Sequence, residues 1–326
     1  MNYRYCILII IGMTCTVFNG TKAYAQMDYL RYHQGVVQAE KLIVEERYEE
    51  AFQVFDSIFE KVDFVFLRDR KVALQLAFFS GDTDGGFSYL KKAIESGWEF
   101  KSIRKQQFLK PYLDDPRWKV LEKEYKSLRE NYEGRLDQKT RSRVERMYKK
   151  DQKMAMGALL RIGDKAQEKY AEKKFAPHSE EQVLKIQNIM KELGYPGEQL
   201  IGNDYWTSTI LSHHNSISNE YNRKDTLYIQ MRPMLKKAIS SGKLSPYEFA
   251  IIDDWYRAVA FDRNVPGYGF VNHVASSTLT ESNDLRQEIG LRTIALRNSL
   301  VDAASKTGMD FYLPDWINGK ITVEDR

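Results

Sequence analysis

Two histidines and an aspartate are the residues of this chain best suited to general acid–base chemistry. His213 and His214 are adjacent, and Asp254 follows among apolar residues. Imidazole titrates near neutral pH and a carboxylate can fix its tautomer, so the two form a minimal acid–base pair. Neighbouring helical residues point about 100° apart, so only one histidine can face a given site. We predict His214 as the base, Asp254 as its orienting partner and Tyr268, in a glycine-flanked loop, as a residue lining the substrate.

Structural roles compete with these chemical ones. His214 can cap carbonyl groups at a helix C-terminus, where cationic side chains are favoured. Asp253 and Asp254 lie among Phe, Ile and Trp residues, so one of them can be buried. A buried aspartate needs a partner, which Arg257 or Arg263 can supply as a salt bridge.

Asp151 and Asp253 are further candidates, for ligand binding. A metal site is a weaker hypothesis, because no H-E-x-x-H pattern occurs and no third ligand accompanies the two adjacent histidines. The sequence also lacks a G-x-S-x-G motif, a phosphate loop and a dinucleotide fingerprint. We therefore expect neither a metal nor a cofactor, and the motifs do not specify a reaction.

Clear helix signals bracket the candidate residues. Ser245-Pro246-Tyr247-Glu248 combines a serine cap, proline at the first helical position and glutamate at the third, and predicts a helix to about Ala260. Four similar signals predict further helices. A capping box at Ser179 begins a helix over 180–193, and Asp204 caps a helix over 205–213. Asp225 caps a helix that runs to Ser241, and Ser282 or Asn283 caps a helix over 284–306. No stretch of useful length alternates with period two, so we predict an all-α fold.

The N-terminal region repeats itself with an offset of 35 residues. The segment 46–52 aligns with 81–87, and small Ala51 and Gly86 occupy equivalent positions before an apolar helix stripe. This spacing resembles that of tetratricopeptide repeats, whose period is about 34 residues. The alternative is a generic pair of helical hairpins, because stable solenoids usually need three or more units.

A basic segment joins the two halves. From Arg135 to Lys174 there are 13 basic and 6 acidic residues, no proline and few glycines, which predicts one long or kinked connecting helix whose first half is solvated. Its charge suits either an anionic partner or, more simply, a solvent-exposed connector.

The first 25 residues have the pattern of an export signal. A basic start at Arg4 precedes an apolar run and the small-residue ending Ala23-Tyr24-Ala25, after which we expect cleavage before Gln26. Both cysteines, Cys6 and Cys15, lie in this segment, so the mature chain has no thiol. A retained membrane anchor and a lipid anchor on Cys15 are the alternatives, and the expected location is periplasmic or secreted.

A second resemblance covers about residues 145–295. The short motifs that carry it are, in chain order, Asp151-Gln152, Gly194-Tyr195-Pro196, Ile201-Gly202, His214, Ala250 with Asp254, Tyr268-Gly269, and Arg286 with Gly290-Leu291. Their order is similar to that of a bacterial family known as domain of unknown function 6624, and this likeness implies a fold and a pocket without implying a reaction. The chain departs from the family at Trp255, where Arg is frequent, and at Phe270-Val271, where Thr-Gln is frequent.

These observations predict a signal peptide (1–25), TPR-like helical-hairpin repeats (26–130), a connecting helix (131–178) and a compact helical domain (179–326). The mature chain carries 47 basic residues, after loss of Arg4 and Lys22 from 49, against 45 acidic ones, which disfavours nucleic-acid binding. No later segment is apolar enough for stable membrane insertion. We expect a protein-interaction or ligand-binding module, with a hydrolase-like enzyme using His214 and Asp254 as the alternative. Nothing in the sequence indicates the oligomeric state.

Overall fold

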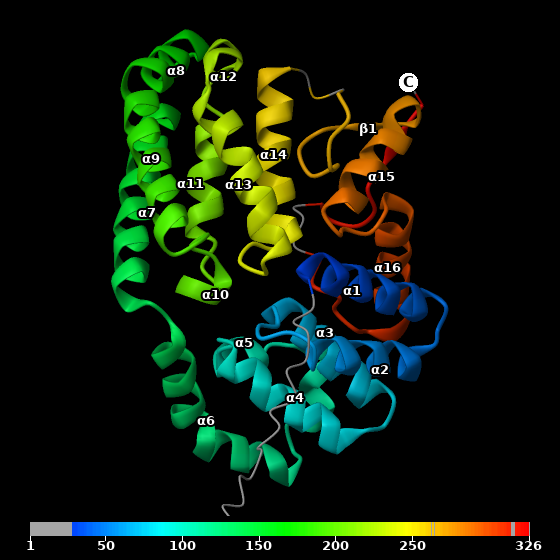
Figure 1. Cartoon of the computed structure of the whole chain (residues 1–326). Helices are drawn as coiled ribbons and strands as arrows, with labels where there is room; N and C mark the ends of the chain where they lie inside the picture. Colours follow the sequence, from blue (N-terminus) through cyan, green and yellow to red (C-terminus); the bar gives the residue numbers. More distant parts are fainter. Residues whose placement is uncertain (1–27, 262, 264, 314–316, 326) are drawn as a thin grey trace, which may run out of the picture.

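The computed structural model describes residues 28–325 except 262, 264 and 314–316, and it confirms the all-α prediction (Figure 1). The predicted signal peptide, with Cys6 and Cys15, lies outside the described residues. The N-terminal helices are α1 (Tyr29–Val44), α2 (Tyr48–Phe59), α3 (Leu67–Phe79), α4 (Thr83–Glu95), α5 (Phe100–Ile103) and α6 (Pro116–Arg135). They are followed by α7 (Gln138–Leu159), α8 (Asp164–Tyr170), α9 (Ala176–Glu192), α10 (Glu198–Ile201), α11 (Trp206–His214), α12 (Asn219–Lys224), α13 (Leu227–Ser240), α14 (Pro246–Ala260), α15 (Leu279–Glu288) and α16 (Ile294–Thr307). Two short strands, β1 (Val274–Ala275) and β2 (Val323–Glu324), pair in parallel.

Helices α1 to α4 form two packed hairpins, α1 with α2 and α3 with α4. The aligned small residues lie where helices approach closely: Ala51 is fully buried, and a Cβ atom added to Gly86 would lie 2.6 Å from the ring of Phe78. This close approach explains the repeated small residue. Membership of the tetratricopeptide class remains a prediction.

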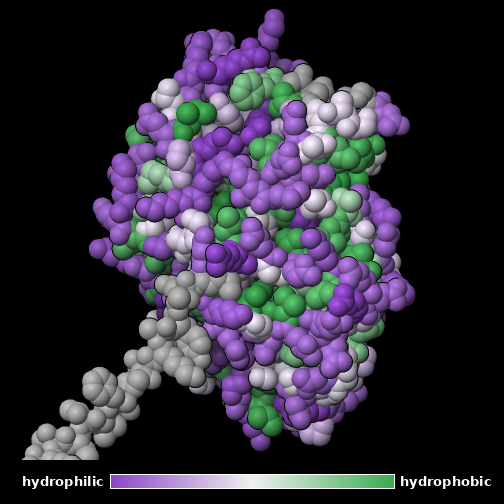
Figure 2. All heavy atoms as spheres, turned by 45° about the vertical axis from the view of Figure 1, so that its right-hand side comes forward, coloured by the Kyte–Doolittle hydropathy of each residue, from purple (hydrophilic) through white to green (hydrophobic). Residues whose placement is uncertain are grey.

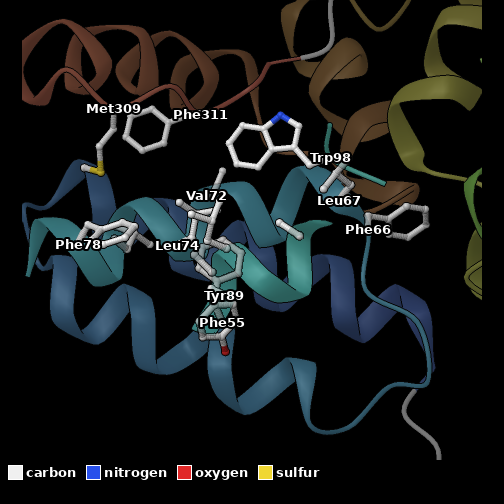
Figure 3. Close-up of a cluster of buried hydrophobic side chains, with 14 of the residues drawn as sticks. Phe55, Phe66, Leu67, Val72, Leu74, Phe78, Tyr89, Trp98, Met309 and Phe311 are labelled. Carbon is white, nitrogen blue, oxygen red and sulfur yellow. The ribbon is translucent and has the colours of Figure 1, made fainter. Parts of the chain in front are cut away.

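The C-terminal segment completes the core of this N-terminal region. Leu300 of α16, Met309 and Phe311 belong to the same hydrophobic cluster as Trp98 and Phe78. Figure 3 shows Met309 and Phe311 entering from the C-terminal ribbon above the α3 side chains. The end of the range predicted as a separate C-terminal domain therefore packs against the repeats.

Hydrogen bonds and ion pairs also hold the C-terminal segment against the N-terminal helices. Gln75 of α3 donates to the carbonyl of Asp310 (2.7 Å) and accepts from the Asp310 backbone N–H (2.8 Å). Arg292, between α15 and α16, pairs with the buried carboxylate of Glu40 on α1, and Arg68 of α3 lies 2.7 Å from the same carboxylate. The two guanidinium groups neutralise a carboxylate that is fully removed from water.

The basic connector reverses direction instead of forming one helix. The chain turns at residues 160–163, where Gly163 has a positive φ of 88°, and α7 lies alongside α9 (Figure 1). The first half of α7 is not fully solvated as expected, because Val144 and Met147 are buried. These side chains contribute to apolar clusters that also contain residues of α9 and, for Met147, of α11, α13 and α14.

Two of the predicted helix caps, Ser245 and Asp225, are confirmed, and two others, Ser179 and Asp204, are wrong. The Ser245 hydroxyl accepts the Glu248 N–H as predicted, and Asp225 accepts backbone N–H groups at the start of α13. Ser179 lies inside α9, because that helix begins earlier, at Ala176, with proline in its first turn. Asp204 pairs with Arg141 and caps no helix.

The predicted helix 284–306 is two helices. The break falls after Glu288, where Gly290 has φ +79°, and Thr293 caps α16. Gly308 ends α16 in the left-handed conformation, close to the predicted stop.

The visible face in Figure 2 is mainly hydrophilic, with hydrophobic residues in small separate groups. Within the described part of the chain, no helix has the length and apolar character required to cross a bilayer.

Candidate functional site

His214 contacts Ser179 and Asp225 in the protein interior and does not contact Asp254. Its Nδ1 atom lies 3.0 Å from the hydroxyl of Ser179, and its Nε2 atom lies 3.2 Å from a carboxylate oxygen of Asp225. Ser179 and His214 are almost completely buried. The Ser–His–Asp combination therefore has no access for a substrate, and it holds α9, α11 and the start of α13 together.

Asp254 and Tyr268 are brought together, but through the backbone. The carboxylate of Asp254 accepts the N–H groups of Tyr268 (2.6 Å), Phe270 (2.7 Å) and Val271 (3.1 Å). Complete burial raises the pKa of Asp254 to about 6, although the three N–H groups favour its ionised form. Asp254 thus fixes the loop after α14, and the predicted pair of His214 with Asp254 does not form.

Asp253 is the centre of a salt-bridge cluster. Arg257 contacts it at 2.8 Å, as predicted, and Arg232 contacts its other oxygen at 2.6 Å. Tyr228 donates a third hydrogen bond at 2.7 Å. Burial favours the neutral acid, but the two guanidinium groups and the hydroxyl outweigh it and hold the pKa of Asp253 below its usual value. All of these contacts are structural.

His213, the neighbour of the predicted base, makes a partly exposed contact with a carboxylate. Its Nδ1 atom donates to Asp151 Oδ2 at 2.6 Å, and Asp151 is fully buried on α7. The His213 side chain retains 29% of its exposure. With Nδ1 donating, Nε2 is left as a hydrogen-bond acceptor. The Oδ1 atom of Asp151 is buried without a hydrogen-bond partner in the described structure.

His213 lines a groove between α11 and α14, which we call the α11–α14 groove. Its volume is about 540 Å³, within the range of small-molecule sites. One wall is a polar stripe of α11 and its flanking residues, spaced three or four apart as on one helix face. The lining residues are Tyr205, Ser208, Thr209, Ser212, His213 and Ser216 on this wall, with Tyr247, Glu248, Ile251 and Trp255 on α14.

Glu248 supplies a nearly buried carboxyl group to the groove. Burial raises its pKa to about 7, while hydrogen bonds from Tyr195 and Ser245 and the nearby hydroxyl of Ser208 act in the opposite direction. Ser208, whose hydroxyl lies near Glu248, and His213 are five residues apart on α11. His213 therefore lies about 7 Å further along the helix axis than Ser208. A ligand in the groove can therefore reach both an imidazole and a carboxyl group.

Two buried hydroxyl groups of the lining lack protein partners among the described residues. These are Ser212 Oγ and Tyr247 Oη, and both residues are at least nine-tenths buried. A buried hydroxyl without a partner carries a desolvation cost of about 1–3 kcal/mol. Both oxygen atoms are covered in the described structure, so a ligand in the groove would reach them only after these side chains shift.

The groove continues at both ends. Tyr205 and Tyr247 also border a small cavity at the boundary with the repeats, where Glu198 accepts the N–H of Leu67 at the start of α3 (2.7 Å). Burial raises the pKa of Glu198 to about 8. At the other end, His213 and Ser216 border a second cavity next to α8.

The sequence contained a signal for this site that its motifs did not reveal. The hydroxyl and histidine positions 208, 209, 212, 213 and 216 fall on one helix face. Glu248 has the position of a helix-capping residue, and that local role does not indicate that it lines a groove. Among the described residues, no group of three or more His, Cys, Asp or Glu side chains is arranged to hold a metal ion.

Comparisons with protein-family models, curated proteins and solved structures find no match to this chain. The two family resemblances in the sequence therefore remain predictions.

Proposed function

We propose that the chain is an exported ligand-binding protein and that the α11–α14 groove binds a short saccharide. The observation that carries the proposal is the lining of the groove, which places the aromatic rings of Tyr205 and Trp255 beside hydroxyl groups, the imidazole of His213 and the carboxyl group of Glu248. Ser212 Oγ and Tyr247 Oη lie beneath this lining without protein partners among the described residues.

The chemistry of the lining favours a saccharide. A sugar ring has apolar faces and a rim of hydroxyl groups, and its faces pack well against aromatic rings. Tyr205 and Trp255 offer such rings, while Glu248 and His213 can pair with ligand hydroxyls. The volume of the groove accommodates a ligand of a few rings.

Fluorescence titration with cellobiose, maltotriose and N,N′-diacetylchitobiose tests this proposal. We expect at least one to change the tryptophan emission saturably, because Trp255 lines the groove. The Trp255→Phe variant, measured in parallel, should lose that change. Absence of binding by all three sugars, checked by calorimetry, would refute the saccharide assignment.

The second candidate is a hydrolase that acts on the same ligand, and it is favoured by the His213–Asp151 contact. His213 Nε2 would take a proton from water as the water oxygen bonds to the anomeric carbon, and protonated Glu248 would donate a proton to the glycosidic oxygen as its bond to that carbon breaks. A p-nitrophenyl glycoside of whichever sugar binds tests this step. Release of nitrophenolate that Asp151→Asn abolishes without loss of binding would support the enzyme, and binding without release would exclude it.

Export and partner binding complete the proposal. The leader ending at Ala25 supports a periplasmic or secreted location, and the helical hairpins offer a surface for a protein partner. A groove of about 440 Å³ between α2, α3, α4 and the end of α6 carries both charged and aromatic residues, including Phe59, Arg70 and Tyr89. Removal of residues 1–25 from the secreted protein is the measurement that tests export.

A further inference from the structure

The turn between α7 and α8 exposes large apolar side chains. Ile162 is 98% exposed, Leu160 is 76% exposed and Met156, one turn earlier on α7, is 52% exposed. Scattered exposed apolar residues are ordinary on protein surfaces. Three within seven positions, on a turn that projects from the end of a helix pair, are a concentrated apolar tip.

Basic residues surround this tip. Between positions 153 and 174 the chain has six lysine or arginine residues against three aspartate or glutamate residues. Arg161 lies between the two most exposed apolar residues, and the lysines of α8, Lys165 and Lys169, are exposed. Long basic side chains can extend toward phosphate groups while neighbouring apolar residues enter a less polar layer.

Another exposed apolar residue lies at the same end of the molecule. Phe261, which follows α14, is also exposed, and Arg223 of α12 donates to the carbonyl of Ala260 beside it (2.9 Å). Figure 1 shows α8, α12 and the C-terminal end of α14 together at the top of the molecule, opposite the repeats. This end can therefore approach a flat surface without obstruction by the N-terminal helices.

We propose that this end docks reversibly on an anionic lipid bilayer, with Leu160 and Ile162 entering the interface and the surrounding lysines and arginines contacting the headgroups. The surplus of positive charge favours an anionic surface. The aliphatic side chains would also bury apolar surface in the interface, which strengthens binding beyond charge attraction alone. A loop tip of this kind binds at the surface without a spanning helix. The groove near His213 continues toward this end through its second cavity, so docking would hold the ligand site close to the membrane.

Vesicle co-sedimentation tests the proposal. The chain from Gln26 onward, which retains every described residue, would be mixed with vesicles of phosphatidylglycerol and phosphatidylcholine in equal amounts, and with phosphatidylcholine alone. We expect partition into the anionic vesicles that falls as salt rises from about 0.1 to about 1 M, because screening weakens the headgroup contacts. The double variant Leu160→Ser/Ile162→Ser should bind about tenfold more weakly.

A matched control separates the tip from general surface hydrophobicity. Val120→Ser/Ile229→Ser removes two other exposed apolar residues, 53% and 47% exposed, on α6 and α13, and should bind as the unaltered chain does. Circular dichroism verifies that both variants are folded. Equal binding by the tip and control variants, equal partition into neutral vesicles, or no binding to anionic vesicles would each overturn the proposal.

Discussion

His213 Nδ1 donates to the fully buried Asp151 Oδ2 at 2.6 Å, and this contact joins α11 to α7. It fixes the orientation of an imidazole that lines the α11–α14 groove and the neighbouring cavity next to α8. A buried carboxylate that fixes the tautomer of an exposed histidine is suited to binding a ligand hydroxyl or to proton transfer.

Replacement of Asp151 by Asn should change the tautomer of His213. In the unaltered chain the proton resides on Nδ1, because only a protonated nitrogen can donate to the carboxylate. The asparagine amide can rotate to offer its own N–H, which would favour the proton on Nε2. Long-range ¹H–¹⁵N correlation spectra of the imidazole measure the tautomer. An unaltered chain with its proton on Nε2 would contradict the hydrogen bond described.

Glu248 should make the protein less stable as pH rises from about 5 to 7. Its pKa is raised to about 7 in the folded state and returns to its ordinary value near 4.5 on unfolding. Between these values the folded state binds more protons, so the free energy of unfolding falls with increasing pH. Glu248→Gln should reduce this fall by roughly 1–3 kcal/mol.

Urea unfolding at several pH values measures the effect. Glu198 and Asp254 have raised pKa values of about 8 and 6, so part of the slope should remain in the variant. Glu281→Gln, a change at an exposed position of α15, serves as the control. A slope that is identical in the Glu248 and Glu281 variants would show that Glu248 ionises normally in the folded protein.

Local signals in the sequence predicted helix ends well where one short motif decides them. The serine cap, proline and glutamate at 245–248 act within one helical turn, and α14 begins at Pro246 as predicted. Ser179 has a similar pattern, but α9 begins earlier, at Ala176, and a π turn at Ala171–Phe175 leads directly into it. That extension depends on packing of Phe175 in an apolar cluster with Ile217, a contact between distant segments.

The candidate site was harder to predict because helix rotation decides which side chain faces a cavity. His213 and His214 are equivalent in a motif, and the packing of α11 against α7, α9 and α14 buries the second and leaves the first on the groove. Contacts between distant residues are equally hard to predict from local sequence. Glu40 and Arg292 are 252 positions apart and are in contact only because the C-terminal segment packs against α1. No local pattern encodes such a meeting.

Gly86→Ala should destabilise the repeats, although alanine usually favours helices. The added Cβ would lie 2.6 Å from the Phe78 ring, and relief of this clash should cost on the order of 1–3 kcal/mol. Gly134→Ala on α6 is the matched control, because a Cβ there meets nothing within 4 Å and should stabilise by up to about 1 kcal/mol. Ala51→Leu should destabilise as Gly86→Ala does. Denaturant midpoints compare the three, and equal midpoints for the two glycine variants would refute the close helix contact.

Tyr247→Phe should separate ligand binding from stability. The Tyr247 hydroxyl is buried without a partner in the described structure, so its removal should leave the free energy of unfolding unchanged or raise it by up to about 1 kcal/mol. Tyr228→Phe is the control, because that hydroxyl donates to Asp253 at 2.7 Å and its loss should destabilise by about 1–3 kcal/mol. Saccharide affinity should fall several-fold in Tyr247→Phe, since the ligand loses one hydrogen bond, and should be retained in Tyr228→Phe while the chain is folded. Unfolding curves and fluorescence titrations on the same samples measure both quantities. A Tyr247→Phe variant that loses stability but keeps its affinity would mean that the hydroxyl serves the fold and does not contact the ligand.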